Sequence, residues 1–409
     1  MLHEFWNNFT HNLFKPLLLF FYLGFLIPIL KVEFEFPYVI YQGLTLYLLL
    51  AIGWRGGEEL ANIDPSSIAR VVGFMLLGFV TNFVMGLLAY GLLTRLTSLR
   101  RIDRATVAGY YGSDSAGTFA TCIGVLAAVG LTFDAYMPVM LAIMEIPGCL
   151  VALYLVTRLR QRGMDPLGNM SDEPGYNPRA RPEFITAAQV SHGHHPETEL
   201  EWAVEEELEI SLELREHPDP AEGNAPTAIR SRIFTRQMLR EILLNPGLYL
   251  LFGGIAIGLV GGLQGEKVMH DGDTVFVSAF QGMLCLFLLE MGMTASRKLK
   301  DLRAAGRGFV VFGLLAPNLF ATLGIAIMHS YAHLTHTHFQ PGNYVLFAVL
   351  CGAASYIAVP AVQRLAIPEA SPTLPLAASL GLTFSYNVTI GIPVYIQMAH
   401  TVTSWFPVG

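Results

Sequence analysis

Apolar runs of about 20 residues, each bounded by charged or turn-forming residues, recur along the whole chain. A run of this length is what an α-helix needs to cross the hydrocarbon core of a bilayer. Ten such helices are predicted, in two groups of five separated by a long polar stretch at 158–240. Their ranges are 13–30, 38–54, 70–94, 105–130, 135–157, 243–263, 275–294, 307–330, 343–365 and 376–402.

Two apolar runs, 107–130 and 345–367, contain residues that break a helix. The first includes GYYGSDSAGTF, in which Asp114 stands among small hydroxylated residues at mid-span. The second includes CGAASYIAVPAV, in which Pro360 follows Ser355. Lipid offers no hydrogen bonds to a broken main chain, so such breaks persist only where they line a cavity enclosed by protein. A matched pair, one in each half, indicates the substrate site of a secondary transporter.

Composition places the chain among integral membrane proteins. Hydrophobic residues make up 53% and charged residues 14%, against about 25% charged residues in a soluble domain. The absence of a basic patch argues against a nucleic-acid partner, and the four cysteines lie in apolar runs without a CxxC pair. No HExxH, GxSxG or Walker motif occurs, so neither an enzyme nor a cofactor other than a coupling ion is predicted.

Positive charge alternates between loops. Arg and Lys crowd the segments 95–104, 158–162 and 297–307, whereas 131–134 and 331–342 contain neither residue. Positively charged loops face the cytoplasm, which predicts a cytoplasmic central linker with both termini outside. Five helices per half, an odd number, then give the two halves opposite orientations. An even count, from one missed or spurious helix, is the rival topology.

A faint internal repeat agrees with this topology. The sequence LLLAIGWR ends the second helix at 48–55, and LLEMGMT ends the seventh at 288–294. The predicted fold class is therefore an all-α integral membrane protein with ten transmembrane helices in a five-plus-five inverted repeat. Its predicted parts are a first repeat at 1–157, an acidic cytoplasmic linker at 158–240 and a second repeat at 241–409.

The central linker differs in composition from the spans. Residues 165–177 are rich in Gly, Pro, Asn and Asp and are expected to form a mobile loop. The histidines at 192, 194 and 195 are compatible with a metal site or with simple solvation. Apolar residues at spacing four within 199–216 predict an acidic amphipathic helix, either solvated on the cytoplasmic face or serving as a regulatory, partner-binding element.

Five motifs follow one another along the two halves. They are GYYGSDSAGTF at 109–119, MEIPG at 144–148, LLEMGMTASRKL at 288–299, AVLCGAASYIAVPAVQRLAIPEA at 348–370 and GIPVYIQMA at 391–399. In this order they resemble the sodium-dependent bicarbonate symporters first recognised in cyanobacteria. The resemblance covers nearly all of both transmembrane halves but not the acidic linker.

The resemblance implies a homotrimeric transporter of the bacterial inner membrane, with a gate domain and a core domain in each protomer. In such proteins bicarbonate and sodium bind where the two broken helices of the core domain face each other. The expected function is import of bicarbonate by sodium symport through alternating access. A small PII-like regulatory protein at the cytoplasmic face is the expected partner, besides membrane lipid.

The chain departs from the cyanobacterial pattern at both breaks. Tyr356 stands where that pattern has an aspartate, and Asp114 stands where it is apolar. Serines of the second motif are replaced at Ala353, Ala354 and Ala358, while Ser355 is kept. The alternative function is therefore a sodium- or proton-coupled permease for another small anion.

A small oxyanion needs hydrogen-bond donors and positive potential, and the N-terminus of a half-helix supplies both. Asp114 is a sodium ligand or an N-cap of the half-helix. A carboxylate costs about 2.5–3.5 kcal/mol at mid-membrane, which favours the ligand. Glu145 and Glu290 are candidate ion or proton relays, or structural hydrogen-bonding groups. The expected substrate-binding residues are Gly112, Ser113, Ser115, Gly117, Thr118, Gly352, Ser355 and Tyr356, and the expected sodium-coupling residues are Asp114, Ser115 and Ser355.

The inverted topology predicts which side of the membrane each segment faces. In a variant without native cysteines, a single cysteine within 165–177 should react with an impermeant maleimide only from the cytoplasmic side. A cysteine near the C-terminus should react only from the outside. Labelling of both from the same side would contradict the inverted repeat.

Overall fold

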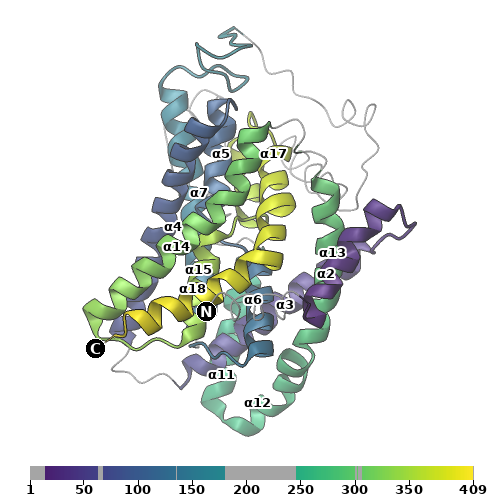
Figure 1. The fold of residues 1–409 in the computed structure, drawn as a ribbon, viewed down its shortest axis with the longest axis vertical. Coiled ribbons are helices and arrows are strands. Elements are labelled where there is room, and N and C mark those ends of the chain that lie inside the picture. Colours follow the sequence, from purple (N-terminus) through teal and green to yellow (C-terminus); the bar gives the residue numbers. More distant parts are fainter. Residues whose placement is uncertain are drawn as a thin grey trace, which may run out of the picture.

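The regular elements of the described residues are all helices (Figure 1). The computed structural model describes residues 14–62, 68–134, 136–179, 246–299, 302 and 306–408. The first half contains α2 (Pro16–Leu30), α3 (Tyr38–Leu60), α4 (Ile68–Leu96), α5 (Arg101–Tyr111), α6 (Ala116–Val129) and α7 (Met137–Gln161). The second half contains α11 (Pro246–Gln264), α12 (Glu266–Asp273), η3 (Thr274–Ser278), α13 (Phe280–Lys298), α14 (Arg307–Thr335), α15 (Pro341–Gly352), α16 (Ala358–Ala366), α17 (Thr373–Leu376), η5 (Ala377–Phe384), η6 (Asn387–Gly391) and α18 (Ile392–Trp405).

Four helices of the described residues, α4, α7, α11 and α14, are long and apolar enough to cross a membrane, and α2 and α15 are shorter apolar helices. On α4 the residues Leu76, Val80, Val84 and Leu88 follow one another at spacing four and are all exposed. An exposed apolar stripe of this kind is what a helix presents to lipid. The chain is thus a multi-pass helical membrane protein.

The helices form two groups, which lie side by side in Figure 1. In the glycine-packed group, α3 packs mainly against α11 and α2 mainly against α13. In the broken-helix group, α4, α5 and α7 pack together, α14 packs against α15 and η5, and α6 packs against α15. The two groups meet where α13 contacts η5 and α6. Both halves of the chain contribute to each group.

Glycine allows the close approach of helices in the glycine-packed group. A Cβ at Gly292 of α13 would collide with the Phe21 carbonyl of α2. A Cβ at Gly53 of α3 would lie 2.5 Å from the Leu251 carbonyl oxygen of α11. Contacts this close exclude any side chain, and small residues at helix interfaces are how membrane helices bring their main chains together.

The same two helix pairs also pack through glycines in the opposite direction. A Cβ at Gly24 of α2 would collide with the Leu289 carbonyl of α13. A Cβ at Gly254 of α11 would lie 2.8 Å from the Leu50 carbonyl oxygen of α3. Each interface therefore has a glycine on both helices.

The observed helices differ from the predicted ones where a helix contains π-helical turns. The predicted helix 275–294 corresponds to the π-helical turn η3 and to α13, which extends to Lys298, while α12 precedes the predicted range. The predicted helix 376–402 contains two wide π-helical stretches, η5 and η6, before α18. A π turn shifts the side chains that follow it around the helix axis, and such turns are frequent at functional sites. Apolar periodicity carries no signal for them.

Residues 165–177 form a compact hydrogen-bonded turn, in contrast to the mobile loop expected from their composition. The Asp165 carboxylate accepts the main-chain N–H groups of Leu167 at 3.0 Å, Asn169 at 2.7 Å and Asn177 at 2.7 Å. Burial raises the pKa of Asp165, but these hydrogen bonds outweigh that effect and hold its pKa below the ordinary value.

This turn is docked on the start of α5. The Glu173 carboxylate accepts the main-chain N–H of Arg101 at 2.7 Å. The Arg100 guanidinium forms an ion pair with Asp103 at 2.8 Å and donates to the main-chain oxygen of Glu369 at 3.2 Å. The first residues of the predicted linker are therefore attached to the start of α5. The segment before α17 is attached to the same place through Glu369. The predicted amphipathic helix at 199–216 and the histidines at 192, 194 and 195 lie outside the described residues.

The glycine contacts predict which substitutions destabilise the fold. Gly292→Ala places a methyl group against the Phe21 main chain, whereas a Cβ at Gly282, on the same helix, meets nothing within 4 Å. Overpacking costs about 1–3 kcal/mol, so Gly292→Ala should lower the thermal unfolding midpoint of the purified protein by several degrees. Gly282→Ala should leave it unchanged or raise it. Equal midpoints for the two variants would contradict the close packing of α2 and α13.

Candidate functional site

The first helix break separates α5 from α6. Gly112 ends α5 at a crowded point, where a Cβ would lie 3.0 Å from the Cα of Gly86 in α4. Ser115 then caps α6, and its hydroxyl accepts the main-chain N–H of Thr118 at 3.2 Å and the Thr118 hydroxyl at 2.9 Å. The first turn of α6 is thereby stabilised by a side-chain cap inside the protein.

The second helix break separates α15 from α16. The carbonyl of Gly352, at the end of α15, accepts the side-chain amide of Asn387 at 2.9 Å. The Asn387 carbonyl oxygen in turn accepts the Tyr395 hydroxyl at 2.8 Å. All three residues are buried. A main-chain oxygen freed by the break is thus paired within the protein, as lipid requires.

A main-chain hydrogen bond joins the two breaks. The N–H of Ser355 donates to the carbonyl of Tyr110 at 2.8 Å. The Tyr110 hydroxyl donates to the side chain of Gln363 in α16 at 2.8 Å, and the Tyr111 hydroxyl lies 2.6 Å from that of Thr383 in η5. Segments from opposite halves of the chain therefore meet at the middle of the broken-helix group.

Asp114 is fully buried at the first break, with 0% of its surface exposed. Within the described residues, neither of its carboxylate oxygens has a hydrogen-bond partner, and the buried hydroxyl of Ser355 also has none. Since Ser115 caps α6, Asp114 is not the cap. Burying an unpaired charge costs several kcal/mol, a cost that a bound cation removes. These oxygens are therefore the best candidates for sodium ligands.

The two candidate relay residues lie in different places. Glu145 of α7 is beside the first break: its main-chain oxygen accepts the Ser113 hydroxyl at 2.8 Å, and Glu145 and Asp114 interact electrostatically. Glu290 lies on α13 in the glycine-packed group, where its carboxylate accepts the hydroxyl of Thr294 at 2.8 Å. The geometry associates Glu145, and not Glu290, with Asp114.

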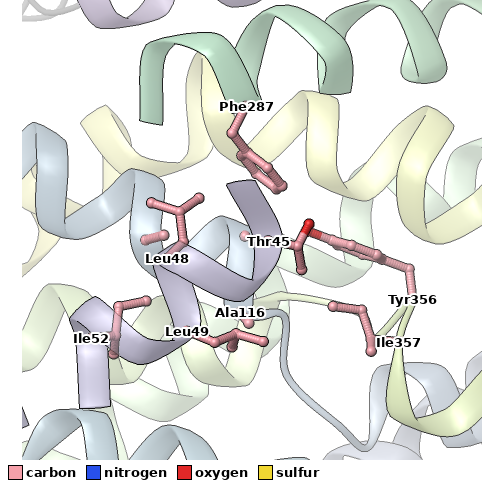
Figure 2. A pocket seen from close by; sticks show the side chains of 10 residues that line it. Thr45, Leu48, Leu49, Ile52, Ala116, Phe287, Tyr356 and Ile357 are labelled. Atoms are coloured by element: carbon pink, nitrogen blue, oxygen red, sulfur yellow. The ribbon is translucent and has the colours of Figure 1, made fainter. Parts of the chain in front are cut away.

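A narrow pocket lies between the glycine-packed group and the first turn of α6 (Figure 2). The space in it that water can occupy is about 10 Å³, roughly enough for one molecule. The Tyr356 ring extends into it from the second break, and the hydroxyl lies so close to Gly117 that a Cβ there would collide with it. The lining residues are Thr45, Leu48, Leu49, Ile52, Ala116, Gly117, Ala120, Phe287, Tyr356 and Ile357.

The residues predicted to bind substrate have different roles in this arrangement. Gly117 and Tyr356 line the pocket. The hydroxyls of Ser113, Ser115 and Thr118 already form hydrogen bonds within the protein. Main-chain contacts that leave no room for a side chain occur at Gly112 and Gly352. The structure thus brings the predicted residues of both breaks together, but only part of the set faces the pocket.

Other residues of the site were not assigned a role from the sequence. Gln363 joins the two broken helices through Tyr110, and Thr383 joins η5 to the first of them through Tyr111. Each is a polar residue within an apolar stretch, which is a usable signal. Thr45 and Phe287 line the pocket from the glycine-packed group. Nothing in the sequence separates these two from ordinary span residues.

Two broken helices that meet around a buried carboxylate, in a multi-pass helical protein, are typical of a secondary transporter. The chain matches the family model of the Na⁺-dependent bicarbonate transporter superfamily over residues 16–400, and it therefore belongs to that superfamily. A search of curated proteins finds no match. Membership of a transporter family agrees with the prediction that the protein is not an enzyme.

The bond between Asn387 and Gly352 predicts a loss of stability. Asn387→Ala leaves the buried Gly352 carbonyl without its partner, which costs about 1–3 kcal/mol. A matched control is Thr389→Ala, since that hydroxyl bonds only to main-chain oxygens of its own helix. Thermal unfolding in detergent should separate the two variants, with Asn387→Ala lower. If Thr389→Ala is equally destabilised, the pairing of the second break does not depend on Asn387.

Proposed function

We propose that this protein imports bicarbonate by symport with sodium, through alternating access. The observation that carries the proposal is the buried Asp114 carboxylate, which has no hydrogen-bond partner in the described residues. It lies at a helix break in a chain of the Na⁺-dependent bicarbonate transporter superfamily. A sodium ion at this carboxylate offsets the cost of burying its charge, with Ser355 and freed main-chain carbonyls as further oxygen ligands.

The proposed position of the anion is the first turn of α6. A half-helix N-terminus carries a partial charge of about +0.5 and directs its N–H groups outward. Because residue 117 is a glycine, an anion can approach the main chain there. In this structure the Tyr356 hydroxyl occupies the space beside Gly117. In this proposal Tyr356 moves aside or donates a hydrogen bond to the bound anion.

Electrostatics provide the coupling. An anion at the first turn of α6 is repelled by the Asp114 carboxylate one turn or less away in the chain, unless a cation lies between them. In the low dielectric of a membrane protein interior this repulsion is far stronger than in water. Bicarbonate and sodium therefore bind together more favourably than either alone, which is the requirement for symport.

The glycine contacts support the inverted repeat. Aligning Gly53 with Gly292 also aligns Leu50 with Leu289, and aligning Pro16 with Pro246 also aligns Gly24 with Gly254. Gly24 and Gly53 then each have a counterpart that approaches the equivalent carbonyl of the equivalent partner helix. Chance similarity between apolar helices does not produce equivalent contacts, so the pattern favours two repeats of inverted orientation.

The remaining features are proposed from the resemblance and the charge pattern. The glycine-packed group would be the gate domain, and the broken-helix group would be the core domain. The chain would form a homotrimer in the bacterial inner membrane with both termini outside. The three parts 1–157, 158–240 and 241–409 would be two repeats and an acidic regulatory linker, the latter a docking segment for a PII-like protein.

A second candidate function is a sodium- or proton-coupled permease for another small anion. The observation that favours it is the second break, where Ala353 and Ala354 are buried and carry no hydroxyl, and where Tyr356 fills the pocket. Glu145, beside Asp114, is the proton relay in that case. Uptake of radiolabelled bicarbonate by proteoliposomes, driven by a sodium or a proton gradient in turn, separates the two functions.

Removing the charge of Asp114 tests the sodium site. Asp114→Asn keeps the size of the side chain, so folding should be preserved while sodium-driven bicarbonate uptake falls about tenfold or more, equivalent to about 1.4 kcal/mol of coupling free energy. The control is Asp172→Asn, which removes an acid that pairs with Arg101 in the docked turn at the end of α7. Unchanged sodium dependence in Asp114→Asn would place the coupling ion elsewhere.

The carboxylate can be returned to the opposite break in the same background. Adding Tyr356→Asp to Asp114→Asn places an acid where the cyanobacterial pattern has one. Because the two breaks are joined by the bond between Ser355 and Tyr110, an acid on either side can reach a shared ion. Recovery of sodium dependence would show that the charge, and not the position, matters.

A further inference from the structure

Two histidines converge at the end of α14, far along the chain from the helix breaks. His329 and His333 are four residues apart and therefore lie on one face of the helix. Their Nε2 atoms are 3.1 Å apart, and the two rings are nearly perpendicular, with centroids 4.6 Å apart. His333 is exposed, so the pair is accessible from outside the helix bundle.

The His329 ring is held by a buried tyrosine. The Nδ1 atom of His329 lies 3.2 Å from the hydroxyl of Tyr344, a side chain that is 2% exposed and belongs to α15. Tyr344 packs edge-to-face against Phe339, which in turn packs against Phe74 with ring centroids 5.0 Å apart. A hydrogen bond at Nδ1 orients the ring and leaves Nε2 as the atom directed at His333.

The separation of the two Nε2 atoms fits metal coordination. With metal–nitrogen bonds of 2.0–2.1 Å, two imidazole ligands of one ion lie about 2.9–3.4 Å apart, from a right angle to a tetrahedral angle. The observed 3.1 Å is within this range. Two histidines at this helical spacing are a known way to bind zinc, and imidazole suits zinc, nickel and copper.

We propose that His329 and His333 bind one divalent transition-metal ion, with water completing the coordination shell. The described residues contain no cluster of three or more His, Cys, Asp or Glu side chains able to hold a metal. The site is therefore a two-histidine site with open positions. Its protein surroundings are the Tyr344 hydroxyl and the Phe406 main chain, both hydrogen-bonded to His329, and solvent in front of His333.

The position of this site links it to the second broken helix. Tyr344 is part of α15, whose other end carries Gly352 and the second break. A metal ion on α14 fixes the His329 ring against Tyr344 and so ties the outer end of α15 to α14. Under the proposed topology this end faces the outside, where an extracellular metal ion reaches it.

Metal binding to the purified protein tests the site directly. The protein is prepared in detergent without a histidine tag, in a background where the histidines at 192, 194 and 195 are replaced by glutamine. Equilibrium dialysis against Zn²⁺ or Ni²⁺ should give one bound ion per chain, with binding much weaker in His329→Gln and in His333→Gln alike and lost in the double variant. The matched control is His338→Gln, an exposed histidine beyond the end of α14, which should bind as the parent does.

Two further measurements make the result specific to the geometry. Tyr344→Phe removes the hydroxyl behind His329 and should weaken metal binding by about tenfold without abolishing it. The electron paramagnetic resonance spectrum of bound Cu²⁺ should show two imidazole nitrogens in the parent and one in His333→Gln. His333 is on the surface, so this variant folds even if His329→Gln does not.

The proposal is overturned by any of three results. The parent binds no ion, the double variant His329→Gln/His333→Gln binds as much as the parent, or the Cu²⁺ spectrum shows a single nitrogen. None of these outcomes depends on bicarbonate or sodium transport. Failure of the metal site and failure of the proposed transport function are therefore distinguishable.

Discussion

Inside a membrane, every main-chain N–H and carbonyl group must find its partner within the protein, and two interrupted helices place several such groups at the centre of this molecule. The contacts around the breaks follow from that requirement. Asn387 pairs the carbonyl at the end of α15, Ser115 caps α6, and Ser355 pairs with Tyr110 across the two halves. Asp114 differs from these paired groups, because both oxygens of its buried carboxylate lack a hydrogen-bond partner in the described part of the chain.

Much of this architecture could be predicted because membrane helices have a strong compositional signal. Apolar length gave α4 and α14 within a few residues, and the clustered Gly, Ser and Asp residues indicated the first break correctly. The π-helical stretches η5 and η6 were not predictable, since an extra residue per turn leaves the hydropathy profile unchanged. The turn at 165–177 was misjudged for a related reason: its order depends on the single Asp165 carboxylate, which composition does not reveal.

The site was predicted less completely than the fold. Residues at the breaks, such as Asp114 and Ser355, stand out because polar groups are rare at mid-span. Contacts across the core do not stand out. Thr383 contacts Tyr111 from a helix far away in the sequence. Glu290 and Glu145 are both acids within apolar stretches, yet Glu290 lies in the glycine-packed group, away from the breaks. Sequence spacing predicts neighbours along one helix but not between helices.

The bond between Ser355 and Tyr110 uses main-chain atoms alone. Any residue other than proline at position 355 supplies the same N–H, and every residue at position 110 supplies the same carbonyl. Side chains around the breaks are consequently free to diverge in evolution while the register of the two segments stays the same. An aspartate can be exchanged for Tyr356, or an apolar residue for Asp114, without removing the bond that joins the two segments.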